Sequence, residues 1–145
     1  MLSLPDELKT FLKNEQVCTL AVAMPEGDVY VAPLLFWGDS DNLRMYMCTS
    51  RTSEKMWWLQ SGRTSVRAAL AIGLAKSLPY SLQMRGRLEV FDPLSDPSAG
   101  AQYRLIASDL NNPDDPANAM IVFIPEWARY TDRAHDYTKH QIALA

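Results

Sequence analysis

Residues 43–61 read LRMYMCTSRTSEKMWWLQS, and the character of the chain changes twice within them. Residues 43–48 are apolar enough for a buried strand, residues 49–53 form a polar loop, and residues 54–61 have a helical pattern. Gly62 is well placed to end that helix, because glycine adopts the left-handed conformation without strain. The sequence therefore predicts a strand that leads through a hydroxyl-rich loop into a helix.

The loop itself indicates an anion site. Four hydroxyl side chains and two cations lie within residues 49–55. Arg51 can hold an anionic oxygen through two hydrogen bonds and Lys55 adds a point charge, which suits a phosphate monoester. Glu54 opposes this interpretation unless the helix turns it away. The alternative is that Ser53 only caps the helix while both cations are solvated. Neither a Walker loop nor a Rossmann glycine fingerprint occurs.

The flanking segments indicate a sheet. Residues 17–24 and 29–37 are β-rich, are joined by a turn at 25–28, and precede a second turn at 38–42. With residues 43–48 they predict an antiparallel meander. Pro33 lacks a hydrogen-bond donor, so its strand should be irregular or lie at an edge. The other expected elements are a helix at 5–14, strands at 65–75, 82–91, 119–124, 128–132 and 139–144, a weak helix at 98–108 and a loop at 109–118.

The expected strands and the few short helices predict a mostly β protein of the α+β class. A sheet this long must protect its edges, and closing into a β-barrel does so. Residues 82–91 alternate, with Gln83, Arg85, Arg87 and Glu89 on the polar face. With no repeat or linker, residues 1–145 are expected to form a single domain.

The charge and the hydrophobic pattern of the chain argue against several classes of function. A net charge of −3 and a pI of about 5.3 argue against nucleic-acid or anionic-membrane binding. No apolar run is long enough to span a membrane, and the start MLSLPDELK is not a secretory signal, so we expect a cytoplasmic protein.

The chain has few histidines and cysteines that could bind a metal or form a disulfide. His135 and His140 are the only histidines and have no grouped partners, so no metal site is expected. Cys18 and Cys48 lie in apolar runs, which favours free buried thiols, although one disulfide stays open as an alternative.

Several short features occur in an order that resembles a known family. They are Pro33 in the second strand, a strand ending in Thr49, the helix start Ser53-Glu54-Lys55, the strand 81–86 (SLQMRG), and the tail Phe123-Ile124-Pro125 followed by Tyr130 and Asp132. Over about residues 5–144 the chain resembles the pyridoxamine 5′-phosphate oxidase-like family. The resemblance implies an antiparallel split β-barrel of the FMN-binding type, usually a homodimer with flavin mononucleotide (FMN) at the subunit interface.

The resemblance also implies roles for individual residues. Thr49, Ser53 and Lys55 would hold the flavin phosphate, with Ser50 and Arg51 in the same loop. The second strand would run along the flavin, and Gln83 would reach it. Trp127 begins the family's tail motif, which serves flavin and substrate. The second-strand residues implied are Val31, Ala32, Pro33 and Leu34.

The chain departs from the oxidases at three places. It has no arginine near Val31, it has Glu54 where arginine is usual, and it has Tyr137 where the tail motif ends in arginine. Arg51 is the candidate replacement for the missing phosphate ligands. Whether the protein is an enzyme therefore stays open. One reading is an FMN-dependent oxidoreductase with a small-molecule substrate. The others are a related enzyme using a deazaflavin, and a non-catalytic barrel that stores or senses flavin or haem or binds a protein partner.

Overall fold

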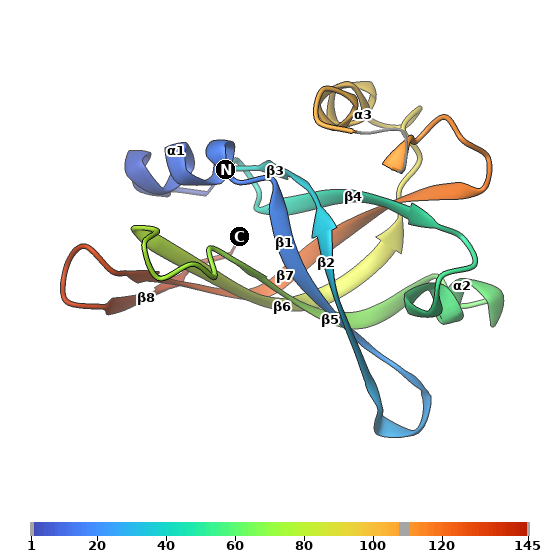
Figure 1. Ribbon diagram of the computed structural model, residues 1–145, viewed down its shortest axis with the longest axis horizontal. Helices are drawn as coiled ribbons and strands as arrows, with labels where there is room; N and C mark the ends of the chain where they lie inside the picture. Colours follow the sequence, from blue (N-terminus) through green and yellow to red (C-terminus); the bar gives the residue numbers. More distant parts are fainter. Residues whose placement is uncertain (1, 108–110, 145) are drawn as a thin grey trace.

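The computed structural model describes residues 2–107 and 111–144, in which strands are the main regular element (Figure 1). The strands are β1 (Val17–Ala23), β2 (Val29–Leu35), β3 (Trp37–Asp39), β4 (Arg44–Ser50), β5 (Ser65–Ile72), β6 (Tyr80–Val90), β7 (Asn118–Asp132) and β8 (Thr138–Ile142). The helices are α1 (Asp6–Asn14), η1 (Pro25–Gly27), η2 (Glu54–Met56), α2 (Trp57–Gln60) and α3 (Pro97–Arg104), where η marks a 3-10 helix. None of these helices is long and apolar enough to cross a membrane.

The strands form one antiparallel sheet in the order β2-β1-β5-β6-β7-β4-β3, with β8 paired to β7. The two ends of this path, β2 and β3, are consecutive in the chain and are separated only by Phe36. The sheet therefore returns on itself through a bent strand, which is the architecture of a split barrel. Phe36 belongs to neither strand. Its N–H donates to Gln16 O at 2.8 Å, and its ring is buried.

This bend corrects the expected meander. The predicted single strand 29–37 is wrong, because it divides at Phe36. Its first part pairs with β1 and its second part pairs with β4, for example Trp37 with Tyr46. The predicted turn 38–42 is also partly strand, since Gly38 and Asp39 belong to β3. Pro33 does lie in an edge strand, as its missing donor predicts.

The two strands expected at 119–124 and 128–132 are one long strand, β7. The first part of β7 pairs with β4 and its last part pairs with β8. Its register with β6 shifts at Glu126. Gly86 lies opposite this bulge, where a Cβ would collide with the carbonyl oxygen of Ile124. Only glycine allows the two strands this close approach.

Two apolar clusters flank the sheet. The barrel interior is filled by alternating side chains from every strand of the path except β3, and Leu8, Phe11 and Leu12 of α1 pack against it. A second cluster lies between α3 and the outer side of β4. Cys18 belongs to the interior cluster and Cys48 to the outer one, so the sheet separates two free thiols.

The expected helices are present with shifted ends. Residues 5–14 correspond to α1, although no side chain caps it. The helix expected at 54–61 is a 3-10 turn followed by one α-helical turn, and Gly62 follows with φ +80°. The helix expected at 98–108 begins at Pro97, and Asp96 caps it by accepting from the Ala99 N–H. Residues 108–110, part of that helix and of the expected loop 109–118, lie outside the described chain.

Candidate functional site

The loop after β4 is organised by Ser50. Thr49 and Ser50 end the strand, paired with Ala119 and Asn118 of β7. The Ser50 hydroxyl accepts from the Thr52 N–H at 3.3 Å, and its carbonyl accepts from the Ser53 N–H at 3.2 Å. These bonds close a tight turn, which brings the chain from the end of β4 directly into η2.

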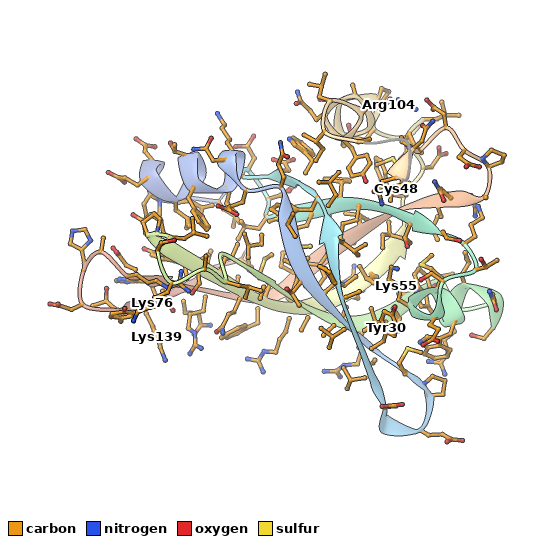
Figure 2. The ribbon with its side chains drawn as sticks, viewed as in Figure 1. Tyr30, Cys48, Lys55, Lys76, Arg104 and Lys139 are labelled. Carbon is orange, nitrogen blue, oxygen red and sulfur yellow. The ribbon has the colours of Figure 1, made fainter. Side chains whose placement is uncertain are left out.

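Lys55 is the unusual residue of this loop. Its side chain is buried, at 7% relative exposure, and its ammonium donates to Ser53 Oγ at 2.8 Å. The same nitrogen lies 6.0 Å from the centroid of the Tyr30 ring on β2 (Figure 2). Within residues 2–107 and 111–144 no carboxylate lies within ion-pair distance of it.

The burial of Lys55 without a counter-charge affects its pKa and leaves donors unused. Burial lowers the pKa of Lys55 below its ordinary value, because no counter-charge compensates the desolvation. An ammonium has three donors, and only one of them has a described partner. Buried cations are stable when they are paired with an anion. Lys55 therefore offers two donors and a positive charge to an anionic group.

Two tryptophans fix the position of Lys55. Trp58 is fully buried, and its indole N–H donates to the Lys55 carbonyl at 2.9 Å. Trp57 is half-buried, and its indole N–H donates to Ala23 O at the end of β1, also at 2.9 Å. The helical turn is thus attached both to the core and to the β1–β2 hairpin, so the buried amine is held in place by rigid groups.

The cations of the loop do not converge. Arg51 is exposed; its Nε donates to Pro116 O at 3.2 Å and its backbone N–H to Ala117 O at 2.9 Å. Arg51 is therefore engaged with the segment before β7, while Lys55 bonds to Ser53. Glu54 is exposed, so the helix does turn it away from Lys55. Ser53 occupies the cap position, but its hydroxyl bonds Lys55 rather than a backbone N–H.

The remaining predicted residues lie on the sheet. Cross-strand partners share a face, so the register defines an outer face, opposite the barrel interior, with two neighbouring rows. One row is Val31, Ala21, Ala69, Arg85 and Trp127. The next row is Pro33, Thr19, Ala71, Gln83 and Arg129. Four predicted residues from distant segments (Val31, Pro33, Gln83 and Trp127) thus share this outer face.

Polar contacts order one end of the outer face. The Gln83 side-chain oxygen accepts from Arg129 Nη2 at 2.7 Å. The Trp127 ring has the Arg85 guanidinium at 4.2 Å and the Arg129 guanidinium at 5.4 Å from its centroid. Ala32 and Leu34 occupy the inner face instead, where Leu34 packs against the barrel core. The four consecutive β2 residues therefore do not form one wall.

The two groups of candidate residues face different directions. Tyr30, beside Lys55, alternates with Val31 along β2 and so points to the inner face. Val31, Pro33, Gln83 and Trp127 point outward. A single chain does not present both groups to one side of the sheet.

Comparison with known proteins identifies the family of this chain. The sequence model of the family described as pyridoxamine 5′-phosphate oxidase matches residues 5–131. The chain belongs to this family. The match includes β1 to β6 and most of β7, so every candidate residue lies within the family region. A comparison with curated proteins finds no significant match.

Solved structures share the fold at low identity. A conserved hypothetical protein from Mycobacterium tuberculosis has a TM-score of 0.68 and 14% identity, over 96% of this chain and 91% of that one. A pyridoxamine 5′-phosphate oxidase-related, FMN-binding protein from Nostoc punctiforme has 0.63 and 14%, over 96% and 90%. A haem-binding protein from Mycobacterium smegmatis has 0.68 and 18%, over 97% of this chain but 60% of that one. The chain is thus similar in fold to proteins of different ligand chemistry.

Sequence reasoning missed two components. The first is Tyr30, which borders Lys55; its only sequence signal is that it alternates with Val31 in a β-rich run. The second is the Arg85–Trp127–Arg129 stack. The alternation of residues 82–91 does place Arg85 beside Gln83 on the polar face, but no local pattern indicates that β7 brings Trp127 against them.

Proposed function

We propose that this protein binds FMN at the interface of a homodimer and acts as a cytoplasmic flavin-dependent oxidoreductase on a small molecule. The observation that carries the proposal is Lys55, a buried ammonium with unused donors and no described carboxylate partner. Family membership supports it, and the fold is shared with an FMN-binding protein.

The donor set fits a phosphate monoester. Lys55 supplies the charge, and the Ser53 hydroxyl, which accepts from Lys55, keeps its own proton free to donate. Thr49 adds a hydroxyl at the end of β4, where its side chain is buried. Charge-assisted hydrogen bonds of this kind are the strong ones in phosphate recognition. Ser50 and Arg51 would support the loop rather than the ligand, because the Ser50 hydroxyl accepts from the Thr52 N–H and Arg51 Nε donates to Pro116 O.

The orientation of the two groups supports the proposed dimer. One copy would contribute Lys55 and Ser53, and the outer face of its partner would contribute Gln83 and Trp127. Val17, Val29 and Val31 leave 56%, 60% and 60% of their surface exposed on β1 and β2. A second copy that covers this apolar strip would remove it from water.

In this proposal the bound flavin supplies the redox chemistry, and the chain's residues bind, orient and shield it. The Gln83 amide is fixed by Arg129 through its oxygen, which leaves its N–H groups to donate to a ring heteroatom. The apolar side chains of Val31 and Pro33 would lie along the ring and exclude water. No side chain of this chain needs to act as a nucleophile.

The test is the visible absorption spectrum of purified protein, before and after FMN is added and the excess is removed. A retained protein-bound flavin spectrum supports the proposal. Ser53→Ala/Lys55→Met should lose that spectrum, while the exposed control Lys139→Met should keep it. A double variant that retains FMN as well as the wild type would overturn the phosphate assignment.

The second candidate is a non-catalytic haem-binding barrel, favoured by the fold shared with the haem-binding protein of Mycobacterium smegmatis. A haem iron needs an axial ligand, and both histidines of this chain already contact other side chains. His140 stacks on Tyr130 with ring centroids 4.9 Å apart, and His135 pairs with Asp132 at 2.8 Å, both around the β7–β8 hairpin. Titration with haem in the same spectrometer distinguishes the two, and a deazaflavin would be recognised by its own spectrum.

A further inference from the structure

A groove of about 600 Å³ lies at one end of the barrel, between α1 and the loop at residues 73–79 that joins β5 to β6. The turn between β7 and β8 forms its third side through His135. Figure 1 shows these three segments at the left of the view and α2, which follows Lys55, at the right. Tyr80, the strand residue that lines the groove, is buried on the inner face. The groove is therefore separate from the Lys55 loop and from the outer face given to the proposed flavin.

The floor of the groove is apolar and largely aromatic. Phe11 of α1 and Tyr80 of β6 meet edge to face, with ring centroids 5.8 Å apart. Gly73 allows this packing, because a Cβ at that position would lie 2.6 Å from the Phe11 ring. Leu78 and Pro79 extend the apolar surface on the loop side. The floor can therefore cover the hydrocarbon part of a ligand and remove it from water.

Arg133 holds the loop side of the groove in place. Its Nη1 donates to the carbonyl oxygens of Ala75, Leu78 and Tyr80 at 2.9, 3.2 and 3.1 Å. Its backbone N–H donates to Pro79 O at 2.8 Å. The guanidinium is thus occupied by backbone oxygens and does not line the groove. A surface that is already ordered loses little conformational entropy when a ligand binds to it.

The charged side chains that line the groove are acidic. Asp6 and Glu7 lie at the start of α1, and Glu15 directly follows its end, about 12 Å from Glu7 along the helix axis. In the part of the chain that the structure describes, none of these three carboxylates forms an ion pair. His135 is the lining group that can become cationic, and its Nδ1 is bonded to Asp132. The groove therefore carries negative charge at both ends and an apolar surface between them.

The Tyr80 hydroxyl is an independent polar feature of the groove. Tyr80 is only 9% exposed, and its described contacts are ring contacts with Phe11 and Tyr130. Among the described residues its hydroxyl has no hydrogen-bond partner. Burial raises the pKa of Tyr80, and the carboxylates of Asp132 and Glu7 raise it further, so the hydroxyl is neutral and lies on the side of the groove near Glu7. A nearly buried hydroxyl without a partner costs free energy, which a ligand that bonds to it would recover.

We propose that this groove binds an elongated aliphatic diamine or polyamine. One ammonium lies between Glu7 and the Tyr80 hydroxyl, the second lies at Glu15, and the methylene chain between them covers Phe11. An ammonium has three donors, which suit carboxylate and hydroxyl oxygens, and these charged bonds are the strong ones. A volume of about 600 Å³ is in the range of small-molecule sites. The site belongs to one chain and depends on neither the proposed flavin nor a second copy.

The test is isothermal titration of the purified protein with 1,8-diaminooctane, 1-aminooctane and 1,8-octanediol. These compounds share one aliphatic body and carry two, one and no positive charges. We expect the diamine to bind about fivefold more tightly than the monoamine, because an exposed ion pair contributes up to about that factor. The diol should bind most weakly. Added salt should reduce these differences, because the carboxylate of Glu7 is exposed.

Substitutions at the two ends of the groove should have different effects. Glu15→Gln should reduce diamine affinity about fivefold, to that of the monoamine, and leave monoamine binding unchanged. Glu7→Gln and Tyr80→Phe should each weaken both amines. Tyr80→Phe keeps the ring that contacts Phe11, so its unfolding midpoint in urea should stay close to that of the wild type. Glu26→Gln removes an exposed carboxylate from the turn between β1 and β2, outside the groove, and is the matched control.

Four results would overturn the proposal. They are equal affinity for diamine and diol, unchanged diamine affinity in Glu7→Gln/Glu15→Gln, an equal loss in the control Glu26→Gln, and no diamine binding by the wild type. The flavin proposal is tested separately, because Ser53→Ala/Lys55→Met should bind the diamine like the wild type, and Glu7→Gln should retain FMN in the absorption spectrum.

Discussion

Replacing Lys55 with methionine should have opposite effects on stability and on ligand binding. Methionine keeps an unbranched chain of similar length in the buried position but removes the ammonium. Without an anion, burying that charge costs desolvation free energy in the folded protein. The one hydrogen bond described for the ammonium, to Ser53, offsets only part of this cost. We therefore expect Lys55→Met to stabilise the flavin-free protein by about 1 kcal/mol.

The same change should weaken FMN binding. A charge-assisted hydrogen bond contributes about 1.5–3 kcal/mol, which corresponds to about a 10- to 150-fold loss of affinity. A residue kept for packing would show the reverse pattern, with stability lost and binding unaltered. The combination of a more stable apoprotein and a weaker complex is therefore the signature of a ligand residue.

The pH dependence gives an independent check. Because burial lowers the pKa of Lys55 in the folded state below its ordinary value of 10.5, the unfolded chain binds the proton more readily at high pH. Stability should therefore rise as pH increases from the folded pKa towards the unfolded one. This contribution should be absent in Lys55→Met, whereas Lys139→Met should keep it, because Lys139 is exposed on β8.

The assays are urea unfolding of flavin-free protein at several pH values and FMN titration followed by flavin fluorescence. The reasoning is refuted if Lys55→Met destabilises the apoprotein by more than about 1 kcal/mol while FMN affinity stays within about twofold of the wild type. That outcome would make the Lys55–Ser53 bond a structural contact.

Three further outcomes follow from the structure. Gly86→Ala should destabilise the protein by about 3 kcal/mol in urea unfolding, because its Cβ would collide with the Ile124 carbonyl. Cys18 and Cys48 should react with iodoacetamide only after unfolding, since burial raises their pKa to about 12 and about 11. Val31→Glu should convert the proposed dimer to a monomer in light scattering with stability within about 0.5 kcal/mol, because Val31 is 60% exposed.

Each of these has a control. Gly100→Ala in α3 places a Cβ 3.2 Å from a proline side chain rather than against backbone, so it should be tolerated far better than Gly86→Ala. Rapid alkylation of either thiol in native protein would show that its cover opens locally. For the dimer, Lys139→Glu changes charge on β8 and should leave the mass unchanged; a monomeric wild type at micromolar concentration would contradict the interface.

Local patterns were sufficient for much of the fold. The amphipathic spacing of residues 5–14, glycine at positions 27 and 62, and the alternation of residues 82–91 each correspond to an element or turn in the structure. The division of residues 29–37 could not be predicted, because the run is apolar on both sides of Phe36. The bend arises from the barrel: β2 must pair with β1 while β3 pairs with β4.

Lys55 shows most clearly where local reasoning fails and what the failure means. The sequence left two interpretations open, an anion site that uses Lys55, or a Ser53 that caps the helix while Lys55 is solvated, and the second is stable without distant help. The structure has neither the Ser53 cap nor a solvated Lys55, because Trp58 holds the Lys55 carbonyl and Trp57 holds Ala23, so that the amine lies beneath β2. Two local preferences are thus overridden, and one charge without a described counter-charge is buried. Natural proteins retain unfavourable local arrangements of this kind mainly at functional sites, and this is why our proposal places the anion of the proposed cofactor at Lys55 rather than at the exposed Arg51.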